Sequence, residues 1–386
     1  MFFKALTAAI IGYLLVWGFY NASHHLLPNT STTSTPTSIE IISTTTATAI
    51  ATTTKIASDK PATTTITTKP KTSITSPVKA TPITITPPVP TPSPMAVTPP
   101  VSAPPADFES INTFARSALV NILCTAGGNE LSPVSGSGIV VNSSGLILTN
   151  AHVAEFFLLK DYRQPNYIKC IVRTGSPAYP RYNAELVYIS PAWVKDNKGL
   201  LKENNPTGTG VNDYAFIRIT SAINGNPVGS LPYLEPSTAE VSELNEPVLL
   251  ASYPAGFLGG VSILENLSVV SAVTTIKEFL TFDDTSVDVI SVPGTVVSQK
   301  GSSGGGVVDA NKKLIGIIST SSDGSSTSDR DLRAITTAYI NRDLQDTTGV
   351  TLTHFIAQDS AVYAQNFQAS IAPGLSKLII DELNKQ

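Results

Sequence analysis

The sequence is poor in the residues that build metal centres. Its 386 residues include two cysteines, Cys124 and Cys170, and four histidines. No group of these residues has metal-ligand spacing, so we expect neither a structural zinc site nor another cofactor. A basic surface is missing too, because the net charge is −4 and residues 106–386 hold 19 Lys and Arg against 27 acids. Binding to nucleic acid is therefore not expected.

Residues 29–105 contain no aromatic residue, no leucine and no glycine. Of these 77 residues, 24 are Thr, 14 are Pro and 9 are Ser. Such a segment cannot bury a hydrophobic core, and its proline content favours extended polyproline II conformations. We therefore predict a disordered Thr/Pro/Ser-rich stalk over residues 29–105.

The N-terminus holds the one long hydrophobic run. Nineteen uncharged residues extend from Ala5 to Ser23, close to the roughly 20 that span a bilayer. A cleavable signal peptide is one interpretation and an uncleaved anchor is the other. Trp17 and Tyr20 suit a membrane interface, and the residues around Tyr20 fit a cleavage site poorly. We favour a membrane anchor over residues 1–28. This predicts a single-pass protein of the cell membrane with an extracytoplasmic domain, or a secreted one if the segment is cleaved.

The composition changes at about Ala106, where aromatic residues, leucine, glycine and acids return. Short apolar runs then alternate with turn residues, a spacing typical of an all-β sandwich or barrel. The runs are ALVNILC, SGIVV, GLILTN, YIKCIVR, YNAELVYI, YAFIRI, PVLLASY, LSVVSAV, VDVISV, GGVVD and LIGIIST. A short amphipathic helix is predicted at DFESINTFARSAL, and another helix at the C-terminal SKLIIDELNKQ.

Three residues that are far apart in the sequence suggest a catalytic site by the order in which they occur along the chain. His152 lies in LILTNAHVAEF, Asp213 follows 61 residues later in VNDYAFIRI, and Ser303 follows 90 residues after that in KGSSGGGVVD. Taken alone, each has an ordinary structural interpretation, and Gly-Ser stretches are usually turns. A Ser-His-Asp unit needs a base beside the serine and an acid that fixes the base's tautomer. The order His, Asp, Ser differs from that of α/β-hydrolases and subtilisins.

With these motifs in this order, residues 108–345 resemble the trypsin-like serine proteases, and most closely their HtrA type. The resemblance is carried by SGSGIVVNSSGLILTNAHV, AELVYISP, DYAFIRI, EPVLLASYPAGFLGG and GSSGGGVVDANKKLIGI. It implies two six-stranded Greek-key β-barrels with the site in the cleft between them. It also implies a protease domain over residues 106–345, followed by a helical tail over 346–386 that is too short for a PDZ domain.

The activity implied is that of a membrane-tethered serine endopeptidase, which cleaves protein or peptide substrates through an acyl-enzyme. By the resemblance, Ser303 is the nucleophile, His152 the general base and Asp213 the carboxylate that orients it. The backbone N–H groups of Gly301 and Ser303 would form the oxyanion hole. HtrA-type cores are often trimers, so a homotrimer is a further possibility.

The resemblance also suggests a substrate pocket. Val297 would lie near the floor of the primary pocket, with walls from Ser319, Thr320 and Ser321, and Ser319 would also support Asp213. A shallow slot with an apolar floor favours Ala, Val or Leu in the substrate. Lys300 at the rim leaves an acidic residue open as the alternative.

A disulfide between Cys124 and Cys170 follows from the same resemblance, which makes their strands neighbours. Export would place them in an oxidising compartment. Two buried free thiols are the other interpretation.

Several features depart from the family pattern. Ser302 stands where the HtrA type has Asn and the trypsins have Asp, Gly306 replaces a usual Pro, and residues 193–212 form an insertion before Asp213. Two other functions therefore remain open. One is a catalytically inactive, protease-like binding module on a stalk, and the other is a surface adhesin whose stalk is the functional part.

Overall fold

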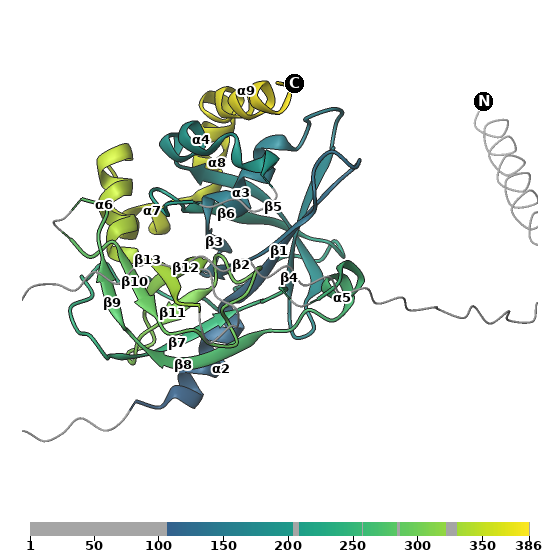
Figure 1. Cartoon of the computed structure of the whole chain (residues 1–386). Coiled ribbons are helices and arrows are strands. Elements are labelled where there is room, and N and C mark those ends of the chain that lie inside the picture. The colour runs from purple at the N-terminus through teal and green to yellow at the C-terminus, as the bar shows by residue number, and fades with distance from the viewer. Residues whose placement is uncertain (1–105, 204–207, 257, 284–285, 322–329, 386) are drawn as a thin grey trace, which may run out of the picture. The chain divides into compact units, whose positions relative to one another are not determined.

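The computed structural model describes residues 106–203, 208–256, 258–283, 286–321 and 330–385 (Figure 1). The expected membrane anchor and stalk, residues 1–105, lie outside this part of the chain. No helix within the described ranges is long and apolar enough to cross a membrane. The described residues form two β-sheets with helices around them, which confirms an all-β architecture of trypsin-like type.

The first sheet is a closed barrel with the strand order β1-β2-β3-β6-β5-β4. Its strands are β1 (Leu119–Ala126), β2 (Val134–Val140), β3 (Leu146–Thr149), β4 (Ile168–Thr174), β5 (Tyr179–Ile189) and β6 (Ala215–Ala222). Each of them contains one of the apolar runs predicted from the sequence. Ile122, Ile139, Leu148 and Phe216 are fully buried, so four of these strands contribute to one core.

The second sheet differs from the six-stranded barrel that we predicted. It has seven strands in the order β8-β7-β11-β12-β13-β10-β9. These are β7 (Pro247–Ser252), β8 (Val270–Thr275), β9 (Glu278–Leu280), β10 (Val289–Val292), β11 (Gly306–Val308), β12 (Leu314–Ser321) and β13 (Leu332–Thr336).

The seventh strand arises from a bend in one extended segment. Ile276 N donates to Glu246 O, beside β7, whereas Lys277 N donates to Ser291 O of β10. The segment therefore pairs with β7 before the bend, as β8, and with β10 after it, as β9. Because the two end strands of the sheet are consecutive in the chain, the sheet is rolled toward a barrel.

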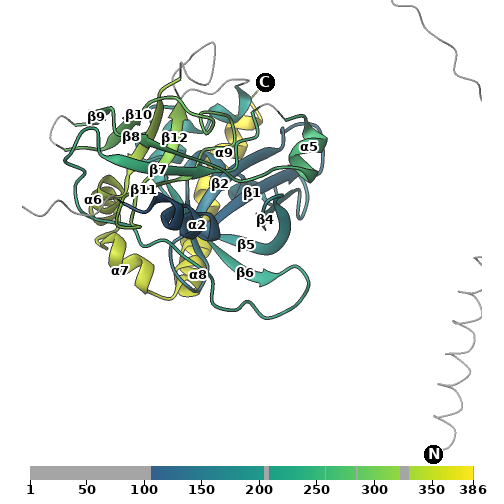
Figure 2. The same cartoon turned by 90° about the horizontal axis from the view of Figure 1, so that it is seen from below.

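The predicted N-terminal helix is α2 (Phe108–Ala118), which packs near β7 and β11 (Figure 2). The Asp107 side chain accepts a hydrogen bond from Ser110 N and caps the helix. Ile111, Ala115 and Ala118 are buried on one face. Of its two phenylalanines, Phe108 is partly buried against the core, whereas Phe114 is 40% exposed.

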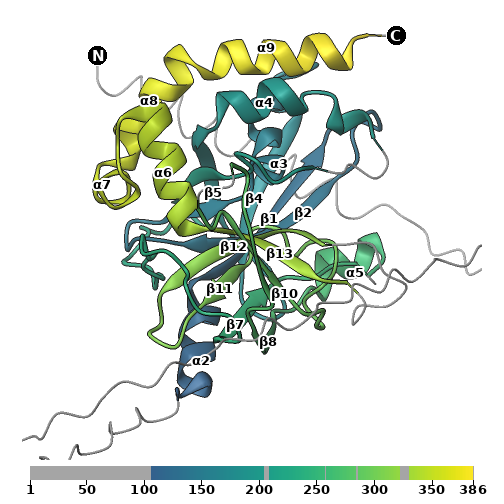
Figure 3. The ribbon, with the colours of Figure 1, turned by 60° about the vertical axis from the view of Figure 1, so that its left-hand side comes forward.

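The C-terminal region is more extensive than the tail predicted from the sequence. Helix α6 (Thr337–Thr348) follows β13 directly, so the expected boundary at residue 345 falls inside a helix. Helices α7 (Leu352–Ala357), α8 (Ser360–Ser370) and α9 (Ala372–Leu383) come next. Helix α8 packs on β5 of the first barrel (Figure 3). Helix α9 packs on α4 (Pro191–Asn197) and on the 3₁₀ helix η1 (Glu155–Leu159).

Candidate active site

His152 lies on α3 (Ala151–Ala154), a single helical turn that begins directly after β3. Its Nδ1 lies 2.8 Å from Asp213 Oδ2 and 3.1 Å from Asp213 Oδ1. The backbone N–H of His152 also donates to Asp213 Oδ1, at 3.0 Å. The imidazole is 32% exposed and the carboxylate only 5%. The structure therefore brings together the base and the acid that the sequence predicted, with the imidazole on the open side.

Asp213 is held by further contacts from both sheets. Ser319 Oγ, on β12, donates to Asp213 Oδ2 at 2.7 Å, which is the supporting contact expected for this serine. Asn150 Nδ2 donates to the backbone carbonyl of Asp213 at 2.9 Å. The two carboxylate oxygens thus accept hydrogen bonds from three donors, two of His152 and one of Ser319. Such donors favour the charged form of a carboxyl group.

The charges of this pair follow from these contacts. Burial raises the pKa of Asp213, but the charge of His152 and the hydrogen bonds from His152 and Ser319 lower it by more, so it stays below its ordinary value. Burial lowers the pKa of His152, but the Asp213 carboxylate raises it by more, so its pKa lies above 6.5. The ionised Asp213 carboxylate accepts a hydrogen bond from the Nδ1–H group of neutral His152. Nε2 is then left with the lone pair that can accept a proton.

Ser303 lies in the loop that precedes β11, and this loop is fixed beside β12. Gly304 N donates to Ile318 O, and Ile318 N donates to Gly305 O, both at 2.8 Å. Ser319 follows at a bulge, where the pairing of β12 with β13 shifts register. The bulge leaves the Ser319 carbonyl outside the ladder, and Ser303 Oγ donates to it at 3.3 Å.

The predicted nucleophile is thus joined to the acid through Ser319 rather than directly to the base. Within the described residues, no hydrogen bond links Ser303 Oγ to His152. A direct contact between the two side chains would require Ser303 Oγ to turn from Ser319 O toward His152 Nε2. Contacts of this kind are commonly loose before substrate binds.

Two glycines let the Ser303 loop approach the rest of the site. Gly301 has φ +92°, and a Cβ there would lie 2.8 Å from Tyr253 O. Gly304 has φ +83°, and a Cβ there would lie 2.0 Å from Ser137 O. Both backbone conformations are strained for residues with a side chain, so glycine is required on steric grounds.

Ser137 of β2 connects the first barrel to this loop. Its N–H donates to Ser303 O at 2.7 Å, and its Oγ donates to Gly301 O at 2.8 Å. The same Oγ accepts from Tyr253 N at 2.9 Å. The two loop carbonyls are therefore fixed by Ser137. The N–H groups of Gly301 and Ser303, the predicted oxyanion donors, have no acceptor in the described part of the chain.

Ser302, the departure from the family pattern, lies beneath the loop and is 1% exposed. Its Oγ donates to Val297 O at 2.5 Å and accepts from Ser252 Oγ at 3.0 Å. Both contacts are internal, so its hydroxyl holds the loop in place and does not face the site.

The predicted substrate pocket finds only partial support. Val297 is fully buried in the core of the second sheet, together with Leu332 and Ala334, so no solvent-accessible space adjoins it here. Its place at a pocket floor stays a prediction. The side chains of Thr320 and Ser321 lie outside the described residues. Ser319 does line a pocket, which is described below.

Cys124 and Cys170 are joined by a disulfide. They lie directly opposite each other on the antiparallel strands β1 and β4. The bond joins two residues of the first barrel that lie 46 positions apart in the sequence. The chain segment between them carries His152.

Sequence reasoning missed the contribution of α6. Tyr339 Oη donates to Asn212 Oδ1 at 2.8 Å and accepts from Asn212 N at 3.1 Å. Tyr214 Oη donates to Asp343 Oδ2 at 2.6 Å. This helix thus holds the residues on both sides of Asp213. The spacing of Tyr339 and Asp343, four residues apart, places them on one helix face and was the available signal.

A second carboxyl group was also missed. Glu155, at the start of η1, is 3% exposed, and its Oε2 has no hydrogen-bond partner among the described residues. Burial and the negative charge of Asp213 raise its pKa well above the ordinary value. Glu155 therefore holds a proton to higher pH than an ordinary glutamate, whereas Asp213 loses its proton more readily. Nothing in NAHVAEF marks this glutamate as buried, because glutamate is nearly always exposed.

Comparison with known proteins agrees with this geometry. Residues 136–317 match the family model of the trypsin-like peptidase domain. The chain therefore contains a trypsin-like peptidase domain, and its fold is that of the trypsin-like serine proteases. A search of curated protein sequences gave no match.

Two solved structures are similar to this chain. The MamO protease domain from Magnetospirillum magneticum, in its apo form, shares 15% identity over 61% of this chain and 100% of its own, with a TM-score of 0.38. The Rv3671c protease from M. tuberculosis, in its active form, shares 18% identity over 65% of this chain and 92% of its own, with a TM-score of 0.39.

Proposed function

We propose that this chain is an HtrA-type serine endopeptidase, tethered to the membrane by residues 1–28 and working outside the cytoplasm. The observation that carries the catalytic part is the continuous hydrogen-bonded chain from Ser303 through Ser319 and Asp213 to His152. A binding module without chemistry has no need of an ionised carboxylate that fixes the tautomer of a half-exposed imidazole. The adhesin alternative leaves this network without a role.

The proposed reaction begins when Ser303 Oγ turns from Ser319 O toward His152. His152 Nε2 takes the hydroxyl proton while Oγ bonds to the scissile carbonyl carbon. The negative charge that develops on the carbonyl oxygen is stabilised by the N–H groups of Gly301 and Ser303, each worth about 3–4 kcal/mol. Protonated His152 then gives its proton to the leaving amine as the C–N bond breaks, and the acyl ester remains on Ser303.

The second half of the reaction repeats these roles with water. His152 removes a proton from the water, whose oxygen attacks the ester carbonyl, and the second tetrahedral intermediate collapses. The carboxylic acid product leaves, and the proton returns to Ser303 Oγ. Asp213 stays ionised throughout and stabilises the imidazolium.

Active-site labelling tests the catalytic part. We expect a fluorophosphonate probe to label the full-length protein on Ser303, and Ser303→Ala to abolish both the label and the turnover of casein. Ser302→Ala is the matched control, since its hydroxyl is buried, and it should keep the label. A label on Ser302, or none on a folded protein, contradicts the assignment, and the second result favours the inactive binding module.

The tether is tested separately. The mature protein should start at residue 1 or 2 and stay with membranes after carbonate washing. A mature N-terminus near residue 24 would instead show a cleaved signal peptide.

A further inference from the structure

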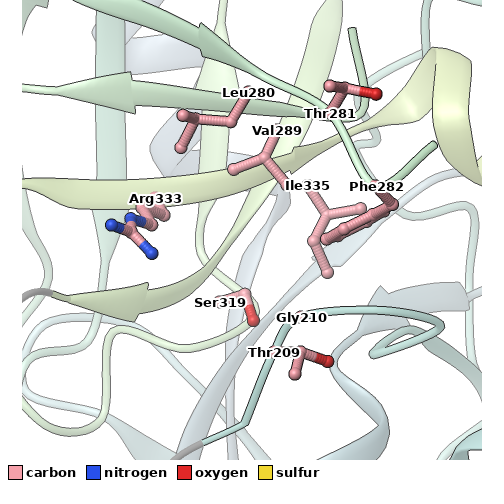
Figure 4. Close-up of a pocket in the computed structure, with 9 residues that line it drawn as sticks. All are labelled: Thr209, Gly210, Leu280, Thr281, Phe282, Val289, Ser319, Arg333 and Ile335. Carbon is pink, nitrogen blue, oxygen red and sulfur yellow. The ribbon is translucent and has the colours of Figure 1, made fainter. Parts of the chain in front are cut away.

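A pocket opens on the Asp213 side of the candidate active site. Ser319 lines it, and the carbonyl of this residue accepts the hydrogen bond from Ser303 Oγ. Thr209 and Gly210, from the end of the insertion before Asp213, form another part of the lining (Figure 4). The pocket therefore adjoins the residue that holds Ser303 Oγ.

One wall of the pocket, formed by Phe282, is held in place by a hydrogen bond and a ring contact. Phe282 N donates to Asp288 Oδ2 at 2.7 Å, and Asp288 is buried and paired with Arg342. The Phe282 ring meets the Tyr339 ring edge-on, with centroids 5.0 Å apart. Since Tyr339 also holds Asn212, the wall is connected to the residue that precedes Asp213. The pocket is thus part of the same rigid assembly as the acid of the site.

The pocket contains one charged side chain among apolar ones. Figure 4 shows the Arg333 guanidinium at one end and the Phe282 ring at the other. Leu280, Val289 and Ile335 are the aliphatic residues of the lining. Arg333 is exposed, and within the described residues no hydrogen bond or ion pair joins its guanidinium to another side chain. Two nearby acids are engaged elsewhere: Asp288 pairs with Arg342, and Asp331 pairs with Lys277. Glu278 lies in the same cross-strand row as Arg333, on the far side of Ser291, and the two form no ion pair in the described part of the chain.

We infer that this pocket binds an acidic side chain of the substrate and that Arg333 is the residue that selects it. A peptide lying over Arg333 displaces water from the guanidinium, and an uncompensated charge resists this. A carboxylate compensates it with two parallel hydrogen bonds that the guanidinium fork is shaped to donate. The apolar lining accommodates the methylene groups of a glutamate. This inference rests on the proposed function, because it concerns selection at the same site.

The test compares matched peptides on the full-length enzyme. Each set carries Glu, Gln or Lys in turn at the four positions on either side of the cleaved bond. We expect the Glu peptide at one position to exceed the Gln peptide in kcat/KM by roughly fivefold, as for a partly exposed charge pair. Added salt should shrink this ratio. Arg333→Met, which keeps the aliphatic stem, should bring it to one, and Arg333→Glu should favour the Lys peptide. Arg181→Met, which removes an exposed arginine of the first barrel, should leave it unchanged.

Binding to a Ser303→Ala protein, followed by fluorescence anisotropy, supplies a readout without turnover. The same Glu preference should appear there and vanish with Arg333→Met. Equal affinity and equal turnover of Glu and Gln peptides at every position would overturn the inference, and so would a Glu preference that survives Arg333→Met. Either result leaves the proposed function intact as long as the probe labels Ser303. An unlabelled, inactive protein instead removes the proposed function, while the anisotropy still decides the role of Arg333.

Discussion

At the scale of single residues, two buried carboxyl groups near His152 have pKa values shifted in opposite directions. Asp213 has three hydrogen-bond donors and a lowered pKa, while Glu155 has no partner for Oε2 among the described residues and a raised pKa. Each shift supports the other, because a second negative charge near Asp213 would be repelled. The difference between the two groups lies in their hydrogen bonds, since both are buried.

Glu155 makes a testable contribution to the pH dependence of stability. Its pKa is raised in the folded protein, so the folded state binds more protons than the unfolded state once the pH exceeds about 4.5. Its contribution is fully present below that pH and is lost as the pH rises through the folded-state pKa. We expect Glu155→Gln to match the wild type near pH 4 and to become relatively more stable toward about pH 8.

Urea unfolding of the two proteins across this range measures the effect. The quantity to follow is the difference in unfolding free energy between variant and wild type, because other titrating groups cancel from it. A difference that stays constant over the range would show that Glu155 is ionised in the folded state.

The candidate triad was predictable at this scale because its motifs are local. TNAHV and GSSGG carry their own geometry, a helical turn after a strand and a glycine loop around a serine. Ser319 was placed by the same resemblance. Glu155 was not, since it lies on η1, which packs against elements from distant parts of the chain, among them α9 more than 200 residues later.

At the scale of elements, α6 acts as a clamp on the loop that carries Asp213. It reaches Asn212 through Tyr339 and Tyr214 through Asp343. Tyr339 and Asp343 bond the neighbours of Asp213 rather than the catalytic groups themselves, so we regard them as positioning residues. It also joins that loop to Phe282 and hence to the pocket wall.

Loosening this clamp should impair catalysis more than folding. Tyr339→Phe removes both hydrogen bonds to Asn212, and we expect kcat to fall about fivefold, the effect of roughly one net hydrogen bond. KM should change little. Because Asp213 raises the pKa of His152, a looser Asp213 should also shift the acid limb of kcat/KM to lower pH.

The pH profile separates positioning from simple destabilisation. Tyr162→Phe is the matched control, since it removes a tyrosine hydroxyl that bonds Asn384 and holds neither neighbour of Asp213. A Tyr339→Phe enzyme whose acid limb coincides with that of the wild type would exclude the clamp.

The elements themselves were unevenly predictable. Each short apolar run predicted to form a strand in residues 106–386 became a strand, because burial on one or both faces leaves a clear pattern. Strand β13 (Leu332–Thr336) was missed, since LRAIT is short and has a charged residue at its second position. So was β9, which exists only because the chain bends at Ile276. Helix α8 has polar residues on much of its surface, so packing on β5 rather than sequence periodicity stabilises it.

At the scale of the whole domain, the C-terminal helices are part of the protease core rather than an appendage to it. Their buried side chains belong to the same hydrophobic cluster as the first barrel. The expected division at residue 345 was drawn where the family resemblance ended. Such a resemblance follows shared motifs, whereas a domain boundary depends on which side chains are buried together.

Deleting residues 346–386 should therefore prevent stable folding. The deletion removes five large buried apolar side chains: Leu352, Phe355, Phe367, Leu375 and Ile379. Burying one such side chain contributes about 1.5–3 kcal/mol, and domains are stable by only about 5–15 kcal/mol. Losing five at once removes most of that margin and also uncovers β5, α4 and η1, next to His152. We expect insoluble protein, or soluble protein without a cooperative thermal transition and without the fluorophosphonate label. Deletion of residues 384–386 alone, beyond the last helix, is the control and should leave melting and labelling unchanged. A truncated protein that melts like the full chain and still takes the label would mean that the barrels form a self-sufficient core, with the helices merely resting on it.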